Sequence, residues 1–364
     1  MRNTAMNMSF FIILGLSFLS FIIPAVWLGR IARKGTFNQS GLGDSSVLII
    51  GSVLLPLSLA AYFLFYQEQD FVGSYKFWQP IIAFGGTILI ALCGHINSLK
   101  KYFWPVLLLC VIVSVVAMPE MGFPLVEQLP PFADKILLAV VWFIFAAIYR
   151  FTNNGNGLLA SQSASIALGI GILGALNAVP MLLGAYGWMM MASLLALTAF
   201  SWYPTRIKIS NNEASAFGFM LFSLIAPVSA EGAGSCCVIF AMYFLVDFVW
   251  ALLLKLTFLP RFDDIYANSA LQQAIENGMN PAQAATFTLR IQMLMLLFGC
   301  FQIYSPTPWS LLFISTLIGI WLVYRFRNIF VATESLKDIN TKVLEELQDR
   351  VDEFKSYVKK DNDF

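Results

Sequence analysis

The residues best suited to chemistry in this chain form a short polar loop between two long apolar segments. Residues 147–160 read Ala-Ile-Tyr-Arg-Phe-Thr-Asn-Asn-Gly-Asn-Gly-Leu-Leu-Ala. Asn153 and Asn156 offer amide oxygens that can ligate a cation, and Arg150 offers a positive charge that can bind a phosphate. The same run of asparagine and glycine is also typical of a simple tight turn, because both residue types accept positive φ. The loop therefore predicts either a polar binding site or only a turn.

Three further polar segments and one acid interrupt the apolar sequence. The segments are Gly94-His95-Ile96-Asn97-Ser98, Arg206-Ile207-Lys208-Ile209-Ser210-Asn211 and Tyr266-Ala267-Asn268-Ser269-Ala270-Leu271, and the acid is Asp247. An ionisable residue inside an apolar span is by default a functional or structural centre. We expect Asp247 to be a structural intramembrane acid that accepts hydrogen bonds from loop amides or pairs with Lys255 or Arg290.

In order and spacing these segments resemble the polyprenyl-phosphate N-acetylhexosamine-1-phosphate transferases of glycosyltransferase family 4. These membrane enzymes transfer a sugar-1-phosphate from a UDP-sugar to a lipid phosphate. The family has Asn-x-x-Asn-x-x-Asp-Gly-x-Asp-Gly-Leu-Ala at the first loop and Gly-x-x-Asp-Asp, Arg-Ile-Phe-x-Gly-Asp and His-x-x-His-Leu at the others. Many bacterial members also keep an aspartate at the place of Asp247. The resemblance implies Mg²⁺ held by aspartates, which neutralises charge during phosphoryl transfer.

The aspartates that the resemblance requires are missing. The family positions read Asn97, Ser98, Asn153, Asn156 and Asn211, and the histidine positions read Ala267 and Ala270. Amide oxygens carry no negative charge, so we expect no metal and no cofactor, with Mg²⁺ bound only if the protein is active. The remaining candidates for binding a phosphate or substrate are Arg206, Lys208, Arg150 and Lys100.

Three functions follow as hypotheses. The first is a catalytically degenerate member of the family that acts in assembly of cell-envelope glycans. The second is an active but divergent UDP-HexNAc:polyprenyl-phosphate HexNAc-1-phosphate transferase, and the third is a transporter-like protein. The expected partners are membrane lipid, including polyprenyl phosphate, and a UDP-sugar, but no nucleic acid.

The composition sets the fold class that must position these residues. Apolar residues make up 59% of the 364 residues and charged residues 12%, against roughly 25% charged residues in soluble domains. The mean hydropathy is +0.74. A helix needs about 20 apolar residues to cross a bilayer, and apolar runs of about this length recur along the chain. The sequence predicts an all-α, polytopic membrane protein with about eleven spans, at 8–28, 46–66, 77–96, 102–118, 135–151, 158–177, 180–203, 214–230, 235–256, 285–304 and 308–325.

Lysine and arginine gather in alternate loops, which predicts the orientation. The N-terminus is expected outside, and the polar segments and the C-terminus are expected in the cytoplasm of a bacterial cell, with the protein in the inner membrane. Residues 1–328 form the membrane domain and 329–364 a cytoplasmic tail. Within the tail, residues 335–358 predict an amphipathic helix. This helix could pack on its own protein, pair with a second copy or dock a protein partner.

Smaller patterns predict packing. The five cysteines show no spacing typical of a metal site and are expected to pack as small apolar residues. Gly169-Ile-Gly171-Ile-Leu-Gly174 lies inside a span, where it favours close approach of two helices rather than nucleotide binding. Within the loop 257–284, a short helix is expected from Ser269 to Gly278. Asn280-Pro281 is expected to start the tenth span.

Overall fold

The computed structural model describes residues 2–33, 78–118, 130–258, 269–276 and 279–326, apart from 97, 153–156, 203–204, 208, 306 and 308. Every regular element in these ranges is helical. Seven of the described helical segments are long and apolar enough to cross a membrane, and three shorter apolar helices accompany them. This confirms a helical, multi-pass membrane protein. The predicted span 46–66 and the predicted tail helix 335–358 lie outside the described residues.

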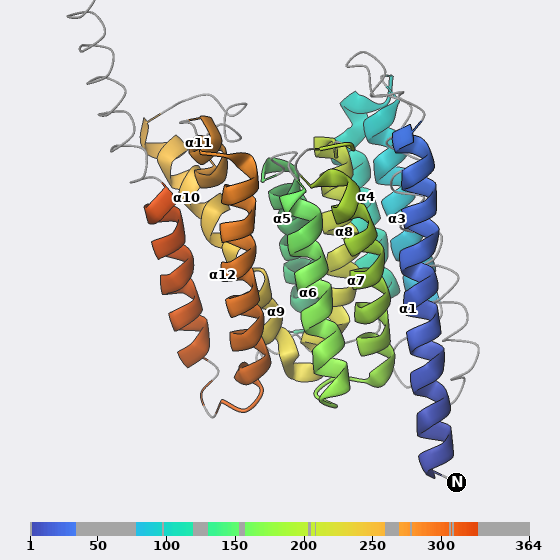
Figure 1. Cartoon of the computed structure of the whole chain (residues 1–364). Coiled ribbons are helices and arrows are strands. Elements are labelled where there is room, and N and C mark those ends of the chain that lie inside the picture. Colours follow the sequence, from blue (N-terminus) through green and yellow to red (C-terminus); the bar gives the residue numbers. More distant parts are fainter. Residues whose placement is uncertain are drawn as a thin grey trace, which may run out of the picture.

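The helices follow the predicted apolar runs. The first half consists of α1 (Arg2–Arg33), α3 (Trp78–His95), a short 3-10 turn η2 (Lys100–Tyr102), α4 (Phe103–Ala117), α5 (Pro131–Phe151), α6 (Leu158–Ala175) and α7 (Met181–Ser201). The second half consists of α8 (Asn211–Val228), η3 (Ser229–Ala233), α9 (Gly234–Phe240), α10 (Met242–Phe258), α11 (Ala270–Glu276), α12 (Pro281–Gln302) and a last helix, Ser310–Phe326. Figure 1 shows that most of them run roughly side by side along one direction.

Helix α6 lies in the middle of the bundle and is buried along nearly its whole length. It packs on α7 at one side and on α12 and α9 at the other. Glycines permit this closeness, because a Cβ atom on Gly174 would lie 2.4 Å from the Cα atom of Gly184 in α7. A Cβ atom on Gly169 would lie 2.7 Å from the ring of Phe240 in α9. The glycine run therefore serves helix packing, as expected for small residues in membrane spans.

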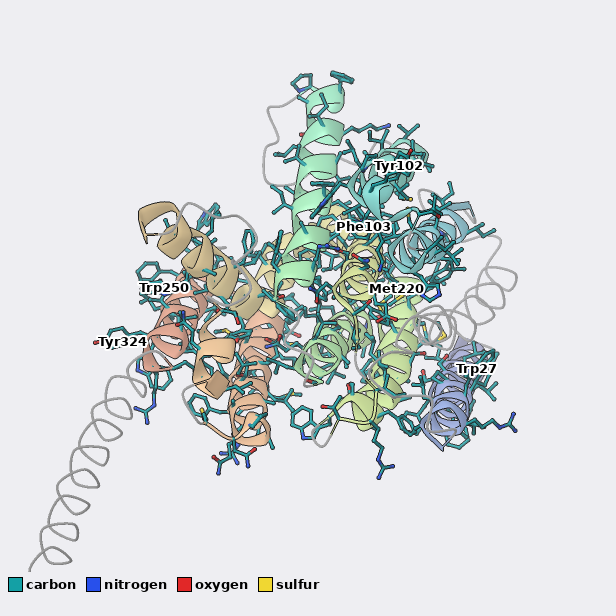
Figure 2. All side chains as sticks on the ribbon, turned by 90° about the horizontal axis from the view of Figure 1, so that it is seen from above. Trp27, Tyr102, Phe103, Met220, Trp250 and Tyr324 are labelled. Carbon is teal, nitrogen blue, oxygen red and sulfur yellow. The ribbon has the colours of Figure 1, made fainter. Side chains whose placement is uncertain are left out.

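Among the described residues, the buried apolar side chains form one large cluster and two smaller ones. The large cluster is built mainly from α1 and α3–α9. The smaller ones, which we call the C-terminal clusters, are built mainly from α10–α12 and the last helix. Figure 2 shows the division from above: Trp250 and Tyr324 lie at one edge, Met220 near the middle and Trp27 at the opposite edge.

One predicted span is corrected by the structure. The sequence predicts a continuous helix over 235–256, but the chain forms α9 and α10 with a break at Ala241. The Nε2 atom of Gln292 in α12 donates a hydrogen bond of 2.6 Å to the carbonyl oxygen of Phe240, just before the break. A carbonyl group freed inside a membrane must find another donor, and α12 supplies it. Just before α9, Gly232 adopts φ 89° and separates it from α8.

The turn expected at residues 305–308 is present. Helix α12 ends at Gln302 and the last helix begins at Ser310. The hydroxyl of Ser305 donates to the carbonyl oxygen of Thr307 over 2.9 Å, and Ser310 donates to the same oxygen over 3.2 Å. Figure 1 shows the two helices lying side by side after this turn. Asn280 and Pro281 start α12 as expected, since the Asn280 side chain accepts from the N–H of Ala282 at 3.0 Å.

Candidate functional site: the junction of α3, α5 and α8

Segments that are far apart in the sequence meet at Asn212, the second residue of α8. Its Nδ2 atom donates a hydrogen bond of 2.8 Å to the carbonyl oxygen of Gly94, near the end of α3. Its Oδ1 atom accepts a short hydrogen bond from the guanidinium group of Arg150, near the end of α5. Asn212, which directly follows the segment 206–211, therefore connects two of the other polar segments to the start of α8. We call this contact the Arg150–Asn212 junction.

Gly94 makes room for the junction. A Cβ atom at this position would lie 2.3 Å from the Cβ atom of Asn212. Real Cβ contacts are never so short, so any larger residue would push α3 away from α8. The glycine of the Gly94-His95-Ile96-Asn97-Ser98 segment thus has a steric function that does not depend on catalysis.

Aromatic rings hold the guanidinium group of Arg150 from the side of α4. Its Cζ atom lies 4.7 Å from the ring centre of Phe103 and 5.3 Å from that of Trp104. Contacts of this length between a cation and an aromatic face are attractive. Arg150 is half-buried, and the two rings and Asn212 fix its charge at the ends of α3, α5 and α8.

The start of α8 is fixed by a capping box. The Ser210 hydroxyl accepts from the N–H of Glu213 at 3.3 Å, and the Glu213 carboxylate accepts from the N–H of Ser210. Each side chain satisfies a helix-end donor that would otherwise lack a partner. Glu213 is buried, and its carboxylate caps the helix. Asn211, which stands where the resembled family has an aspartate, is the first residue of α8 and is exposed.

Gly157, which directly precedes α6, lies against the end of α7. It precedes α6 with φ 75°, a left-handed conformation that favours glycine. A Cβ atom there would also lie 2.7 Å from the backbone nitrogen of Trp202. Gly157 therefore needs to be glycine for its backbone conformation and for its close contact with α7, while Asn153 and Asn156 lie outside the described residues.

The fourth segment is attached to the bundle by Asp247. Its Oδ1 atom accepts a hydrogen bond of 2.9 Å from the N–H of Ala270, the first residue of α11. Asp247 is 1% exposed, so this carboxylate faces protein rather than water. Leu158, at the start of α6, belongs to the same apolar cluster as Ala270 and Leu271. Asp247 thus takes the first of its two expected roles, as acceptor for a loop amide.

Replacement of Asp247 with alanine is expected to release α11. The change removes the acceptor of the Ala270 N–H, and an unsatisfied buried donor costs about 1–3 kcal/mol. Asp247→Asn keeps an oxygen acceptor and should largely preserve the contact. Amide hydrogen exchange over 270–276 measures the effect. Equal exchange in Asp247→Ala and the unaltered protein would show that the contact does not hold α11.

The structure places the other candidate residues at different levels of exposure. Ser98 and Lys100 are exposed after the end of α3, and Arg206 is exposed beside α1 rather than at the junction. Backbone nitrogens of Arg206 and Ile207 both donate to the carbonyl oxygen of Phe200 over 3.0 Å, so the loop folds back on α7. Asn97, Lys208 and Ala267 lie outside the described residues.

The described oxygens do not fit the Mg²⁺ ion that the resemblance implies. Asn212 Oδ1 faces the positive charge of Arg150, and the Glu213 carboxylate caps α8. In the described part of the chain no three His, Cys, Asp or Glu side chains lie close enough together to hold a metal ion. The guanidinium group of Arg150 is instead held between Asn212 and the rings of Phe103 and Trp104.

Asn212, the residue at which these segments meet, was not predicted from the sequence. It follows Asn211 directly, and nothing in the local pattern shows which of the two asparagines turns into the protein. The aromatic partners of Arg150 were also missed, because Phe103 and Trp104 read as ordinary residues of an apolar span.

Comparison with known proteins supplies no family. No protein-family model matches the chain, and no curated protein is significantly similar to it.

Proposed function

We propose that this chain is a membrane protein on the scaffold of the polyprenyl-phosphate sugar-1-phosphate transferases, with a degenerate catalytic site. It would act in the assembly of cell-envelope glycans at the bacterial inner membrane. Its role would be to bind a lipid phosphate or a UDP-sugar without transferring the sugar phosphate. The amphipathic segment 335–358 would pair it with a second copy or with a protein partner.

One observation supports this proposal above the others: the Arg150–Asn212 junction. It joins segments that are 118 and 62 residues apart in the chain. These are the segments in which the sequence resembles the catalytic loops of the family. A transporter that merely shares many spans has no need for these particular loops to meet.

The charge at the junction supports binding rather than transfer. The family reaction requires carboxylates that hold Mg²⁺ between two anionic substrates. The described junction presents an arginine and an asparagine, so it attracts one anion but lacks the ligands that would gather metal. Phosphate binding is thereby retained while the metal-dependent step is lost.

The test is an exchange assay on the purified full chain with Mg²⁺, undecaprenyl phosphate and several UDP-HexNAc donors. We expect no exchange of labelled UMP, together with binding of UDP-sugar or lipid phosphate that Arg150→Gln weakens. Exchange that disappears in Asn153→Ala or Asn211→Ala would establish an active transferase instead. Absence of any binding, with uptake of a solute into proteoliposomes, would establish the transporter.

A second experiment asks whether the scaffold is still competent. Aspartate is introduced together at Asn97, Ser98, Asn153, Asn156 and Asn211. Asn177→Asp, in the turn between α6 and α7, is the matched control because it adds a carboxylate away from the polar segments. Gain of UMP exchange in the fivefold variant alone would support descent from an active enzyme.

A further inference from the structure

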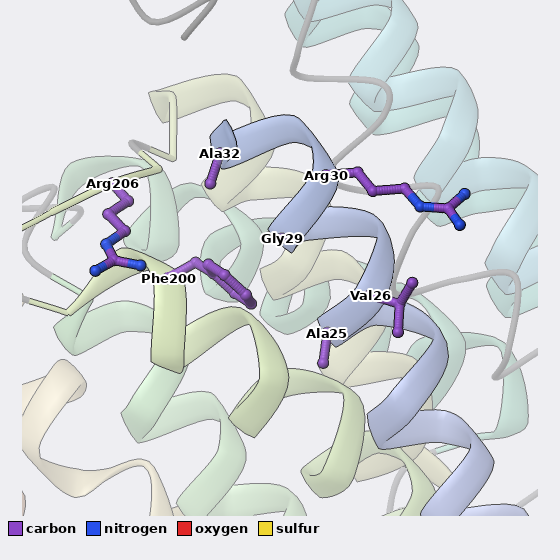
Figure 3. A pocket seen from close by; sticks show the side chains of 7 residues that line it. All are labelled: Ala25, Val26, Gly29, Arg30, Ala32, Phe200 and Arg206. Carbon is purple, nitrogen blue, oxygen red and sulfur yellow. The ribbon is translucent and has the colours of Figure 1, made fainter. Parts of the chain in front are cut away.

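A strip of buried polar side chains runs along the contact of α6, α10 and α12. It consists of Gln162 and Ser165 of α6, Tyr243 of α10, and Thr288 and Gln292 of α12, and each of them is at most 3% exposed. We call these five side chains the polar seam. None of them lines the hollow at the ends of α1 and α7 that Figure 3 shows, so the seam is a separate feature of the molecule.

Two apolar contacts lie at the two ends of the seam and show how the helices face one another. At one end, the Phe240 ring lies between α6 and α12, because an added Cβ atom would lie 2.7 Å from it at Gly169 and 2.3 Å from it at Gly299. At the other end, Leu158 of α6 and Ala285 of α12 belong to one apolar cluster. The facing sides of α6 and α12 are therefore known at both ends.

The polar side chains lie on these facing sides. The seam residues of α6 and α12 stand between the two contact positions of their helix at steps of three, four or seven residues. Residues at these spacings share one face of a helix. Tyr243 joins them from α10, since it belongs to the same apolar cluster as Leu158 and Ala285 and its hydroxyl lies near that of Thr288. The five side chains therefore face a common interior.

Several polar atoms of the seam have no hydrogen-bond partner among the described residues. They are both ends of the Gln162 amide, the hydroxyls of Ser165 and Tyr243, and Oε1 of Gln292. Polar groups inside a membrane protein need a partner, because lipid supplies none. Groups that face one another but lie too far apart to bond directly are bridged by a water or an ion.

The oxygen lone pairs in the seam favour a cation. The Thr288 hydroxyl donates to the carbonyl oxygen of Ala284 over 2.9 Å, so its lone pairs remain. Nε2 of Gln292 donates to the carbonyl oxygen of Phe240 over 2.6 Å, so Oε1, on the other side of the same planar amide, is turned away from that carbonyl group. At both residues the donor is used inside the protein and an oxygen is left, and oxygen atoms are the ligands of hard cations.

A buried acid adjoins the seam. Asp247 lies one helical turn after Tyr243 in α10 and is 1% exposed. Its Oδ1 atom accepts from the N–H of Ala270, and no lysine or arginine of the described residues forms an ion pair with it. A carboxylate inside a membrane bundle is costly unless a positive charge balances it.

We propose that the polar seam binds one sodium ion. The Asp247 carboxylate supplies the negative charge, and Gln162 closes the site from α6. Oxygen atoms of Tyr243, Thr288 and Gln292 complete the ligands. One carboxylate balances one positive charge, whereas Mg²⁺ would keep several waters for which this closed site has no room. A break in a membrane helix, like the one between α9 and α10, is a typical place for a bound Na⁺. This inference does not depend on the proposed function.

The test compares thermal unfolding of the purified full chain in detergent with sodium chloride, potassium chloride or choline chloride at equal ionic strength. A ligand that binds the folded state raises the melting temperature as its concentration increases. We expect this rise with sodium alone, together with saturable binding of radioactive Na⁺. Asp247→Asn keeps an acceptor for the Ala270 N–H but should lose both effects. Thr288→Val, which removes one oxygen and keeps the shape, should lose most of the sodium binding.

Asp134→Asn is the matched control, because Asp134 is also a buried acid and lies in the first turn of α5. This variant should bind sodium as the unaltered protein does. Three results would overturn the proposal: an equal rise in potassium or choline chloride, an unchanged sodium response in Asp247→Asn, or no bound Na⁺ in the unaltered protein, which would leave the seam to water. Binding of UDP-sugar or undecaprenyl phosphate is measured separately with Arg150→Gln, so either proposal can fail while the other stands.

Discussion

Replacing Gly174 with valine is expected to prevent α6 and α7 from packing and to leave little folded protein. The backbones of Gly174 and Gly184 already touch, since an added Cβ atom would lie 2.4 Å from the opposite Cα atom. A backbone cannot rotate away as a side chain can, so the helices would have to separate. Adding atoms to a packed core costs about 1–3 kcal/mol of folding stability where the neighbouring side chains can move. A larger loss is expected here, because the neighbour is backbone. Thermal unfolding in detergent measures the loss.

Gly85→Val provides the control. Gly85 also lies in an apolar helix, α3, but no atom of the described residues stands within 4 Å of an added Cβ atom there. This variant should melt close to the unaltered protein. If Gly174→Val melted at the same temperature as Gly85→Val, the close contact between α6 and α7 would be wrong.

Replacing Arg150 with alanine is expected to destabilise the junction by about 2–5 kcal/mol. A hydrogen bond to a charged group contributes about 1.5–3 kcal/mol, and the contacts with Phe103 and Trp104 add about 0.5–2 kcal/mol. The change also removes the donor that faces Asn212 Oδ1. Arg150→Lys should restore only part of the lost stability, because an ammonium group lacks the planar fork of N–H donors of a guanidinium group. Melting temperature and chemical denaturation are the measurements.

Arg290→Ala is the control for loss of a positive charge, since Arg290 is exposed on α12. A double-mutant cycle with Asn212→Ala then isolates the pair. If the hydrogen bond exists, the sum of the stability losses in the two single variants will exceed the stability loss in the double variant. Strict additivity would show that the two residues act separately.

Six of the predicted spans agree closely with observed helices. Helices α3 to α8 begin and end within a few residues of the predicted ranges, because the cost of placing polar backbone in lipid restricts where a span can stop. The break at Ala241 was not predicted. Neither proline nor glycine stands there, and the donor that satisfies Phe240 comes from Gln292, 52 residues away.

The candidate site was predictable only in part. The sequence marked Arg150 and Asp247 as polar groups beside or within apolar runs, and the structure gives both of them defined partners. It could not reveal that Arg150 meets Asn212, because such a contact depends on how α5 and α8 lie together. The sequence also could not show why glycine is required at 94 and 157, because the requirement depends on residues that pack closely against them in the fold.

The division of the apolar interior into a large cluster and the C-terminal clusters bears on how the chain would leave the bilayer under force. Pulled by its C-terminal end, the protein should yield in two stages. The last helix, α12, α11 and α10 should come out first, and the remaining bundle should resist until a higher load breaks α6 from its neighbours. A single rupture that extracts the whole chain would mean that the clusters share one cooperative unit.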